Sequence, residues 1–131
     1  LALQVNEVLQ TLGHKFGLRT AVVIGGASSF QQIQAIRRRP HIIVSTPGRL
    51  IDHLQNKNIT LEKVNMIVMD EADRMFDIGF LPQIKQILSA APKERQTLMF
   101  SATMPSELLQ IAALIQHQLV LLRSLPSETT D

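Results

Sequence analysis

Cysteine, tyrosine and tryptophan are absent from the sequence. Without cysteine the chain forms no disulfide bond and no thiolate metal site, which agrees with a reducing compartment. Without tyrosine and tryptophan, and with only five phenylalanines, it offers few aromatic rings on which nucleic-acid bases could stack. If the chain binds nucleic acid, we therefore expect it to hold the phosphate backbone.

Long apolar segments are also missing. No run approaches the roughly 18 residues that a membrane-spanning helix needs, and residues 1–7 lack the basic start and apolar middle of a signal peptide. The four histidines are scattered, without the spacing of metal ligands, and are interpreted as core or surface side chains. We therefore expect an intracellular protein, cytoplasmic or nuclear.

Acidic residues are scarce in the first half of the chain. Residues 1–69 carry 8 basic and 3 acidic side chains, whereas residues 70–131 carry 5 basic and 8 acidic ones. A basic first half suits a polyanion such as nucleic acid, although a solvated basic face explains the charge alone equally well. The run Arg37-Arg38-Arg39 closes a predicted helix, and a basic last turn needs no ligand.

Short apolar runs alternate with helical patterns along the chain. Strands are predicted at residues 21–24, 42–44, 66–69, 97–100 and 119–122, and the first two are expected to be buried. The segments around them have helical spacing, starting with an apolar face made by Val5, Val8, Leu9 and Leu12. Alternation of this kind predicts an α/β fold, with a mostly parallel sheet flanked by helices on both faces. We expect one domain over residues 1–122 and a linker or frayed tail over residues 123–131.

The run Asp70-Glu71-Ala72-Asp73 follows the third predicted strand and places three carboxylates within four positions. Carboxylates so close together need water, a cation or a basic partner. They lie at the carboxyl end of a strand, where open α/β sheets bind ligands. In nucleotide hydrolases an Asp at this place helps to hold Mg²⁺, and a neighbouring Glu orients or polarises the attacking water. An acidic surface turn is the alternative.

A second candidate site follows the second predicted strand. The pair Thr46-Pro47 predicts a helix that is capped by Thr46 and has Pro47 at its first position. The first amides of a helix have no intrahelical acceptor and lie at the positive end of its dipole, which suits a phosphate. Arg49 adds a fork that can bind phosphate with two hydrogen bonds. A purely capping Thr46 and an Arg49 paired with a carboxylate are the alternatives.

Four short motifs occur in a fixed order: Gly25-Gly26, Thr46-Pro47-Gly48-Arg49-Leu50-Ile51-Asp52, Asp70-Glu71-Ala72-Asp73 and Ser101-Ala102-Thr103. Their order and spacing together resemble the first RecA-like domain of DEAD-box RNA helicases. The run Phe76-Asp77-Ile78-Gly79-Phe80 and the opening Leu1-Ala2-Leu3-Gln4, which is similar to the end of motif Ia, extend the resemblance over nearly the whole chain.

The resemblance implies an RNA-dependent ATPase that couples ATP hydrolysis to RNA binding and local duplex unwinding. It implies that Asp70 organises Mg²⁺ through water and that Glu71 activates the water that attacks the γ-phosphate of ATP. Three further residues are implied to couple the ATP site to the RNA side: Asp73, Ser101 and Thr103. Contacts to the RNA backbone, which carry no sequence code, are implied for Gly25, Gly26, Thr46, Pro47, Gly48 and Arg49.

The sequence also lacks features of that family. The phosphate loop Gly-x-x-x-x-Gly-Lys-Ser/Thr does not occur in it, nor does the second RecA-like domain with its arginine finger. Gln116-His117-Gln118-Leu119 stands where an Asn-Pro turn is usual. We therefore expect a helicase fragment that begins within a motif and by itself hydrolyses little or no ATP. The alternatives are a non-catalytic module that binds RNA or a protein partner, and another phosphate-loop motor that acts on DNA.

Overall fold

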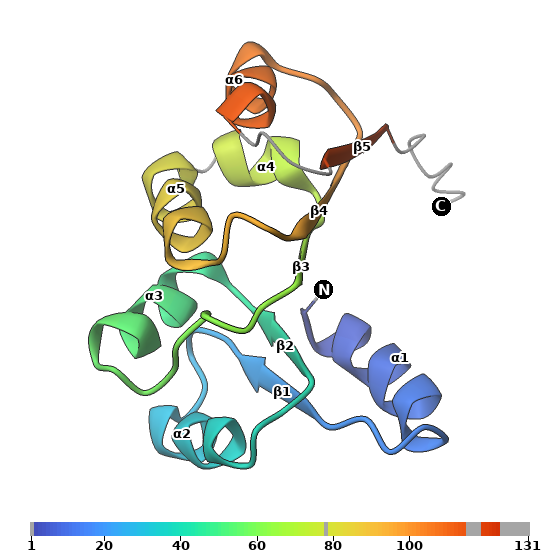
Figure 1. Cartoon of the computed structure of the whole chain (residues 1–131), viewed down its shortest axis with the longest axis vertical. Helices are drawn as coiled ribbons and strands as arrows, with labels where there is room; N and C mark the ends of the chain where they lie inside the picture. The colour runs from blue at the N-terminus through green and yellow to red at the C-terminus, as the bar shows by residue number, and fades with distance from the viewer. Residues whose placement is uncertain (1, 78, 115–118, 124–131) are drawn as a thin grey trace. The chain divides into compact units, whose positions relative to one another are not determined.

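The computed structural model describes residues 2–77, 79–114 and 119–123 of the chain, in which helices and strands alternate (Figure 1). The chain divides into two compact units, Leu1–Thr60 and Leu61–Asp131. None of the described helices combines the length and the apolar character needed to cross a membrane.

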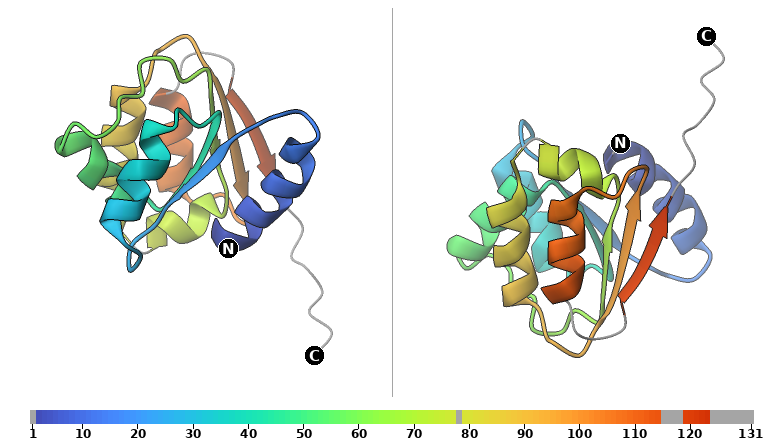
Figure 2. Two further views of the ribbon diagram at one scale, coloured as in Figure 1. Left: turned by 90° about the horizontal axis from the view of Figure 1, so that it is seen from below. Right: turned by 90° about the horizontal axis from the view of Figure 1, so that it is seen from above.

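The first unit is built on two parallel strands. Strand β1 (Thr20–Val23) pairs with β2 (Ile42–Ser45), and Val23 lies opposite Ser45 at their carboxyl ends. The helices of this unit are α1 (Ala2–His14), α2 (Ser29–Arg37) and α3 (Pro47–Gln55). Helix α1 packs against both strands and α2 packs against β1, on the other side of the strand pair (Figures 1 and 2). The loops after β1 and β2 therefore leave the same edge.

The helix boundaries in this unit follow the sequence signals. Ser28 caps α2, because its Oγ accepts a hydrogen bond from the Gln31 amide at 3.3 Å. The helix predicted from the spacing of Val5, Val8, Leu9 and Leu12 is confirmed as α1, but its apolar face is only partly covered. Val8 and Leu12 are 58% and 60% exposed.

The second unit contains three parallel strands in the order β3 (Met66–Met69), β4 (Gln96–Ser101) and β5 (Leu119–Arg123). Its helices are α4 (Ala72–Asp77), α5 (Leu81–Ala90) and α6 (Ser106–Leu114). Arg123, which the sequence analysis assigns to the tail, pairs with Ser101 as the last residue of β5. Residues 115–118 and 124–131, which include the rest of the predicted tail, lie outside the described residues.

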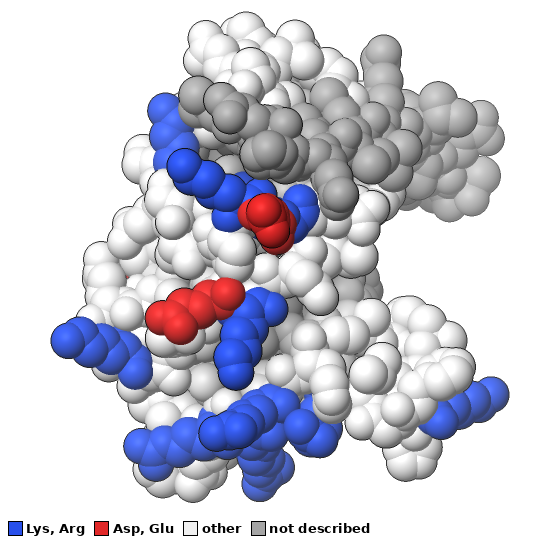
Figure 3. Space-filling view, viewed as in Figure 1, with Lys and Arg blue, Asp and Glu red and all other residues white. Residues whose placement is uncertain are grey.

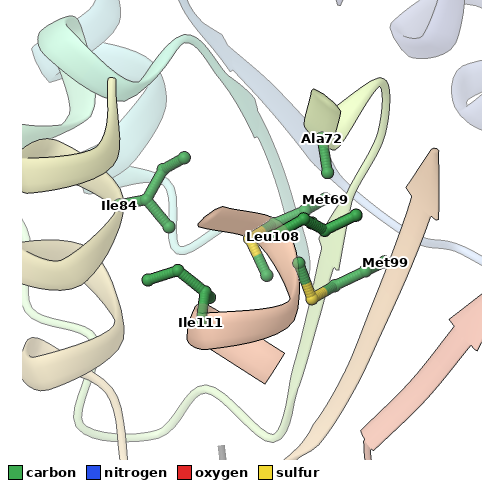
Figure 4. Close-up of a cluster of buried hydrophobic side chains, with 6 residues drawn as sticks. All are labelled: Met69, Ala72, Ile84, Met99, Leu108 and Ile111. Atoms are coloured by element: carbon green, nitrogen blue, oxygen red, sulfur yellow. The ribbon is translucent and has the colours of Figure 1, made fainter. Parts of the chain in front are cut away.

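A cluster of apolar side chains joins the helices of this unit to its sheet. It consists of Met69, Ala72, Ile84, Met99, Leu108 and Ile111 (Figure 4). Burying a side chain of the size of Leu, Ile or Met contributes about 1.5–3 kcal/mol, so the cluster fixes the ends of β3 and β4 firmly. Along β4 the buried side chains are Thr97, Met99 and Ser101, in the alternation expected for a strand.

The predicted α/β class and the parallel pairing are confirmed. The described strands form a two-stranded and a three-stranded sheet. Helix α4 was not predicted, because its six residues are too few to show a helical period.

Candidate functional site

The residues singled out in the sequence fall into two groups, one in each unit. The first follows β1 and β2 and comprises Gly25, Gly26, Thr46, Pro47, Gly48 and Arg49. The second follows β3 and β4 and comprises Asp70, Glu71, Asp73, Ser101 and Thr103. Both groups lie at the carboxyl ends of parallel strands, where α/β sheets bind their ligands.

Asp70 and Glu71 form the turn between β3 and α4, and both are exposed. The Oδ1 atom of Asp70 accepts a hydrogen bond from the Glu71 amide at 2.9 Å. Glu71 has a φ of 50°, a left-handed conformation that is uncommon for residues other than glycine. Its carbonyl oxygen accepts hydrogen bonds from the amides of Arg74 and Met75, at 3.0 and 3.1 Å. The strained residue is thus the predicted catalytic one, as is frequent at functional sites.

Asp73, Ser101 and Thr103 meet in one hydrogen-bond network. Oδ2 of Asp73 accepts from the Thr103 hydroxyl at 2.7 Å and from the Thr103 amide at 3.0 Å. The Ser101 hydroxyl accepts from the Asp73 amide at 3.1 Å and donates to the Thr103 carbonyl at 2.6 Å. The hydrogen bonds, above all that from the Thr103 hydroxyl, lower the pKa of Asp73 and outweigh its partial burial. The network ties the first turn of α4 to the end of β4.

Arg74 lies beside the acidic turn but was not singled out in the sequence. Its Nη1 atom is 3.4 Å from Oε2 of Glu71. Because the two side chains are 73% and 48% exposed, the ion pair adds little stability. The spacing of three residues would have indicated the pair only if α4 had been predicted.

In the first unit, Thr46 connects the loop after β1 to the loop after β2. These loops, with Gly25, Gly26 and residues 46–49, form one edge of the sheet, which we call the candidate RNA edge. Thr46 occupies the N-cap position of α3 with φ −87° and ψ 146°, but its side chain makes no capping hydrogen bond. Instead Oγ1 accepts a hydrogen bond from the Gly25 amide at 3.3 Å. Pro47 stands in the first turn, as predicted. The amides of Gly48 and Arg49, in the same turn, have no acceptor within the helix.

Arg49 is largely engaged within its own unit, with a side chain that is 19% exposed. Its Nη1 atom donates to the carbonyl oxygen of Ala27 at 3.2 Å and to Oε1 of Gln32 at 3.4 Å. The carboxylate of Asp52 is 4.0 Å from Nε, so the alternative, pairing with an acid, is a longer contact than the hydrogen bond to Ala27. The Nη2 atom carries two further N–H donors.

The two glycines of this loop differ in what they require. Gly26 has a φ of 81°, a conformation that residues with a Cβ atom rarely adopt. Gly25 lies outside the left-handed region, and a Cβ atom built on it meets nothing within 4 Å. Neither the backbone nor a neighbouring group in the described residues therefore explains the glycine at position 25. A close approach by a molecule outside the chain would explain it.

Basic side chains dominate the first unit, where residues 1–60 include 7 Lys and Arg against 2 Asp and Glu. They gather over α2 and the loop that follows it (Figure 3). The carbonyl groups at the end of α2 are bound by Arg19, which donates to Arg38 and Arg39 at 3.2 and 3.0 Å. The excess of positive charge on this unit favours the approach of polyanions.

An ATPase site must hold Mg²⁺ and the phosphates of ATP. The acidic turn suits the first of these, Mg²⁺. Among the described residues no three His, Cys, Asp or Glu side chains gather as a metal site. A single carboxylate such as Asp70 suits Mg²⁺ that keeps several waters and is held mainly by phosphates. The ATP phosphates themselves have no counterpart, because the sequence contains no phosphate loop.

Relatives of known function cover most of this chain. It is 49% identical over 118 residues to "ATP-dependent rRNA helicase RRP3" of Yarrowia lipolytica, which corresponds to 88% of this chain and 25% of that protein. It is 47% identical to "DEAD-box ATP-dependent RNA helicase CshA" of Bacillus subtilis, over 86% of this chain and 23% of that protein. The chain thus spans about a quarter of the length of the curated relatives that it matches.

Solved structures of DEAD-box proteins share the fold of this chain. The DEAD box protein of Methanococcus jannaschii superposes with a TM-score of 0.86 at 34% identity, over 93% of this chain and 33% of that one. The yeast DEAD-box splicing factor Prp28 gives 0.85 at 32% identity, over 92% and 29%. These likenesses confirm the predicted RecA-like class. Because the model of the DEAD/DEAH box helicase family also matches residues 1–111, the chain belongs to that family.

Proposed function

We propose that these 131 residues are the part of an ATP-dependent RNA helicase that binds the RNA backbone and supplies the acidic pair of the ATPase site. The observation that carries the proposal is the hydrogen bond between the Gly25 amide and the Thr46 hydroxyl. It brings the glycine loop beside the first turn of α3, whose amides suit a phosphate.

The contacts proposed for RNA are sequence-independent. Gly25 and Gly26 admit phosphates close to the backbone, while Thr46 and the first turn of α3, with Pro47 and Gly48, provide the surface beside them. Arg49 adds positive charge from behind the loop, with its two Nη2 donors available to a phosphate. Contacts with phosphate oxygens position a nucleic acid without reading its bases, which agrees with the shortage of aromatic residues.

The chemistry proposed for the second unit is activation of water for attack on the γ-phosphate. Asp70 would hold Mg²⁺ through water, and Glu71 would accept the proton of the attacking water. One observation supports these roles: both carboxylates are exposed at the carboxyl end of β3. Bound Mg²⁺ would neutralise charge that develops on the phosphates.

Asp73, Ser101 and Thr103 are proposed to transmit the state of the ATP site. Their network links α4, which begins directly after Glu71, to the segment that follows β4. A shift of Glu71 on nucleotide binding would thus displace α4 and, through these hydrogen bonds, Thr103. The partners we propose are RNA, ATP with Mg²⁺, and a second RecA-like domain, all of which place the protein inside the cell.

A non-catalytic RNA-binding module is the second candidate. The lack of a phosphate loop in these 131 residues favours it for the chain by itself, because Glu71 has no positioned phosphate on which to act. RNA-stimulated phosphate release separates the two candidates. We expect background release from the 131 residues, and release at an enzymatic rate only from a polypeptide that also contains a phosphate loop and a second domain.

The RNA edge is tested by replacing Gly25 with Ala and measuring binding of fluorescent single-stranded RNAs of different sequence. Because a Cβ at this position has free space, the variant should keep or slightly raise the thermal stability of the chain. It should nevertheless weaken all RNAs alike, by about tenfold, which corresponds to about 1.4 kcal/mol. Arg49→Ala should also weaken all RNAs alike, and Arg37→Ala, at the end of α2, is the control for its loss of one charge.

Two results would contradict the proposed edge. One is unchanged RNA affinity of the Gly25→Ala variant at normal stability. The other is a loss confined to particular RNA sequences, because backbone contacts weaken every sequence in the same proportion.

A further inference from the structure

Two polar side chains are buried behind the candidate RNA edge. Gln32 on α2 is 4% exposed and His53 on α3 is 1% exposed. A buried polar group costs about 1–3 kcal/mol when its hydrogen bonds are unmade. The contacts of these two side chains are therefore specific features of the fold.

The hydrogen bonds around Gln32 fix the orientation of its amide. Its Nε2 atom donates to the carbonyl oxygen of Ile24 at 2.7 Å, so Oε1 is left as the acceptor. Two donors reach Oε1: His53 Nε2 at 2.9 Å and Arg49 Nη1 at 3.4 Å. Gln32 therefore links the end of β1 to two residues of α3.

The same logic assigns the proton of His53. Because Nε2 donates to Gln32, the ring accepts at Nδ1, where the side-chain amide of Asn58 lies at 3.0 Å. Every polar atom of the imidazole is thus paired in the neutral form with the proton on Nε2. Burial, reinforced by the charge of Arg49, lowers the pKa of His53 and favours the same form.

The chain of hydrogen bonds ends on both sides of the glycine loop. Gln32 binds the carbonyl oxygen of Ile24 before the loop, and Arg49 binds that of Ala27 after it. Gly25 and Gly26 lie between these two anchors, with open space around their Cα atoms. Gly25 and Gly26 have no side chains to pack, so the position of the loop depends on these two anchors together with the hydrogen bond from the Gly25 amide to Thr46.

We infer that Gln32 and His53 are positioning residues for RNA binding, which hold the loop 24–27 and Arg49 in the geometry that meets the phosphate backbone. The inference rests on the proposed RNA edge. Neither residue touches RNA: Gln32 acts through the Ile24 carbonyl and the Arg49 guanidinium, and His53 keeps Gln32 in place. An ordered loop loses less conformational freedom when it binds a ligand, so removing the anchors lowers affinity.

The test is a double-mutant cycle on RNA affinity with Gln32→Met and Arg49→Ala. Gln32→Met keeps the length of the side chain and removes its hydrogen bonds, and should weaken a single-stranded RNA about tenfold. Once Arg49→Ala has released one end of the loop, Gln32→Met should cost less than about threefold, because the two residues anchor the same segment. General destabilisation would instead reduce the affinity by the same factor in both backgrounds.

Ile36→Val is the matched control, since Ile36 is buried on α2 but forms none of these hydrogen bonds. It should lower stability while RNA affinity, measured below the unfolding transition, stays unchanged. If Gln32→Met does not fold, Asn58→Ala takes its place. That variant unpairs only Nδ1 of His53, at the half-buried end of the chain of hydrogen bonds, and should weaken RNA binding by a smaller factor of the same kind.

The outcomes separate this inference from the function on which it rests. If Gly25→Ala and Arg49→Ala leave RNA affinity unchanged, the RNA edge is wrong and the inference falls with it. If those variants weaken binding while Gln32→Met and Asn58→Ala bind as the unaltered chain does, only the positioning role is wrong. Additive losses in the cycle would also overturn it.

Discussion

The hydroxyl of Thr103 donates to the carboxylate of Asp73 at 2.7 Å, across 30 positions of the chain. The Thr103 amide reaches the same Oδ2 atom at 3.0 Å. One carboxylate oxygen thus joins α4, which follows the acidic turn, to the segment after β4. If the state of the ATP site is transmitted through the second unit, this carboxylate is one connection that can carry it.

The first prediction concerns the strength of that connection. In a double-mutant cycle on unfolding free energy, Asp73→Ala and Thr103→Val should show a coupling of about 1.5 kcal/mol, typical of a hydrogen bond to a charged group. Because the hydrogen bonds lower the pKa of Asp73, the coupling is present above its ordinary value of 3.8 and is lost as pH falls through the lowered one. Urea denaturation over a pH series measures it.

The exposed pair of Glu71 and Arg74 serves as the control for this cycle. Its two side chains share α4 and the turn before it, but they meet at 3.4 Å in solvent. A cycle with Glu71→Ala and Arg74→Ala should give no more than about 1 kcal/mol, and less in high salt. Equal coupling for both pairs would contradict the central place given to Asp73 and Thr103.

The second prediction concerns acid sensitivity of the first unit. Burial lowers the pKa of His53, and the unfolded chain therefore binds a proton more readily than the folded one. This contribution to stability is fully present above the ordinary pKa of 6.5 and is lost as pH falls toward the lowered value. It changes by at most about 1.4 kcal/mol for each pH unit.

His53→Gln removes the titration while it keeps a donor and an acceptor in the side chain. The difference in unfolding free energy between the unaltered chain and this variant should shrink as pH falls from 7 to 5. All other titratable groups are the same in both proteins, so their contributions cancel in the comparison. A difference that grows on acidification would show that His53 gains a proton on folding, against the hydrogen bonds drawn here.

The strands and most helices could be predicted from the sequence, because short apolar runs and caps such as Ser28 act locally. The carboxyl-end positions of Gly25 and Asp70 followed from the same alternation. Helix α4 was missed, since it depends on the left-handed turn at Glu71, which the sequence gives no reason to expect. The exposure of Val8 and Leu12 was missed too, because a helical period does not say how much of a face is covered.

The contacts of the candidate site could not be predicted to the same extent. Asp73 is far from Ser101 and Thr103 in the chain, so nothing in the local sequence indicates that they meet. Only the family resemblance predicted that they act together. Gln32 and His53 were overlooked because a single Gln or His on a helix looks like a surface or core residue. Their roles depend on how α2 and α3 meet β1 in space, and pattern alone does not contain that information.

The third prediction contrasts two buried hydroxyl groups on the same face of β4. Oγ1 of Thr97 is buried without a hydrogen-bond partner among the described residues, whereas Oγ of Ser101 bonds to Asp73 and Thr103. Thr97→Val should therefore raise the free energy of unfolding by about 1 kcal/mol, and Ser101→Ala should lower it by about 1–3 kcal/mol. Urea denaturation and amide exchange along β4 would report both changes, and a destabilised Thr97→Val would mean that the hydroxyl has a partner.

The last prediction concerns the end of α3, where Lys57 has a φ of 57°. Its amide and that of Asn58 close the helix by donating to Leu54 and His53, at 3.1 and 2.9 Å. Glycine is the usual residue in this left-handed closing position, because a Cβ is strained there. Lys57→Gly should thus raise the free energy of unfolding by about 0.5–1 kcal/mol.

Lys57→Ala is the control, because it loses the same charge at the helix end but keeps the strain. The gain in stability should therefore be seen in the Gly variant relative to the Ala variant. Equal stability of the two variants in urea would show that the left-handed residue costs the fold nothing.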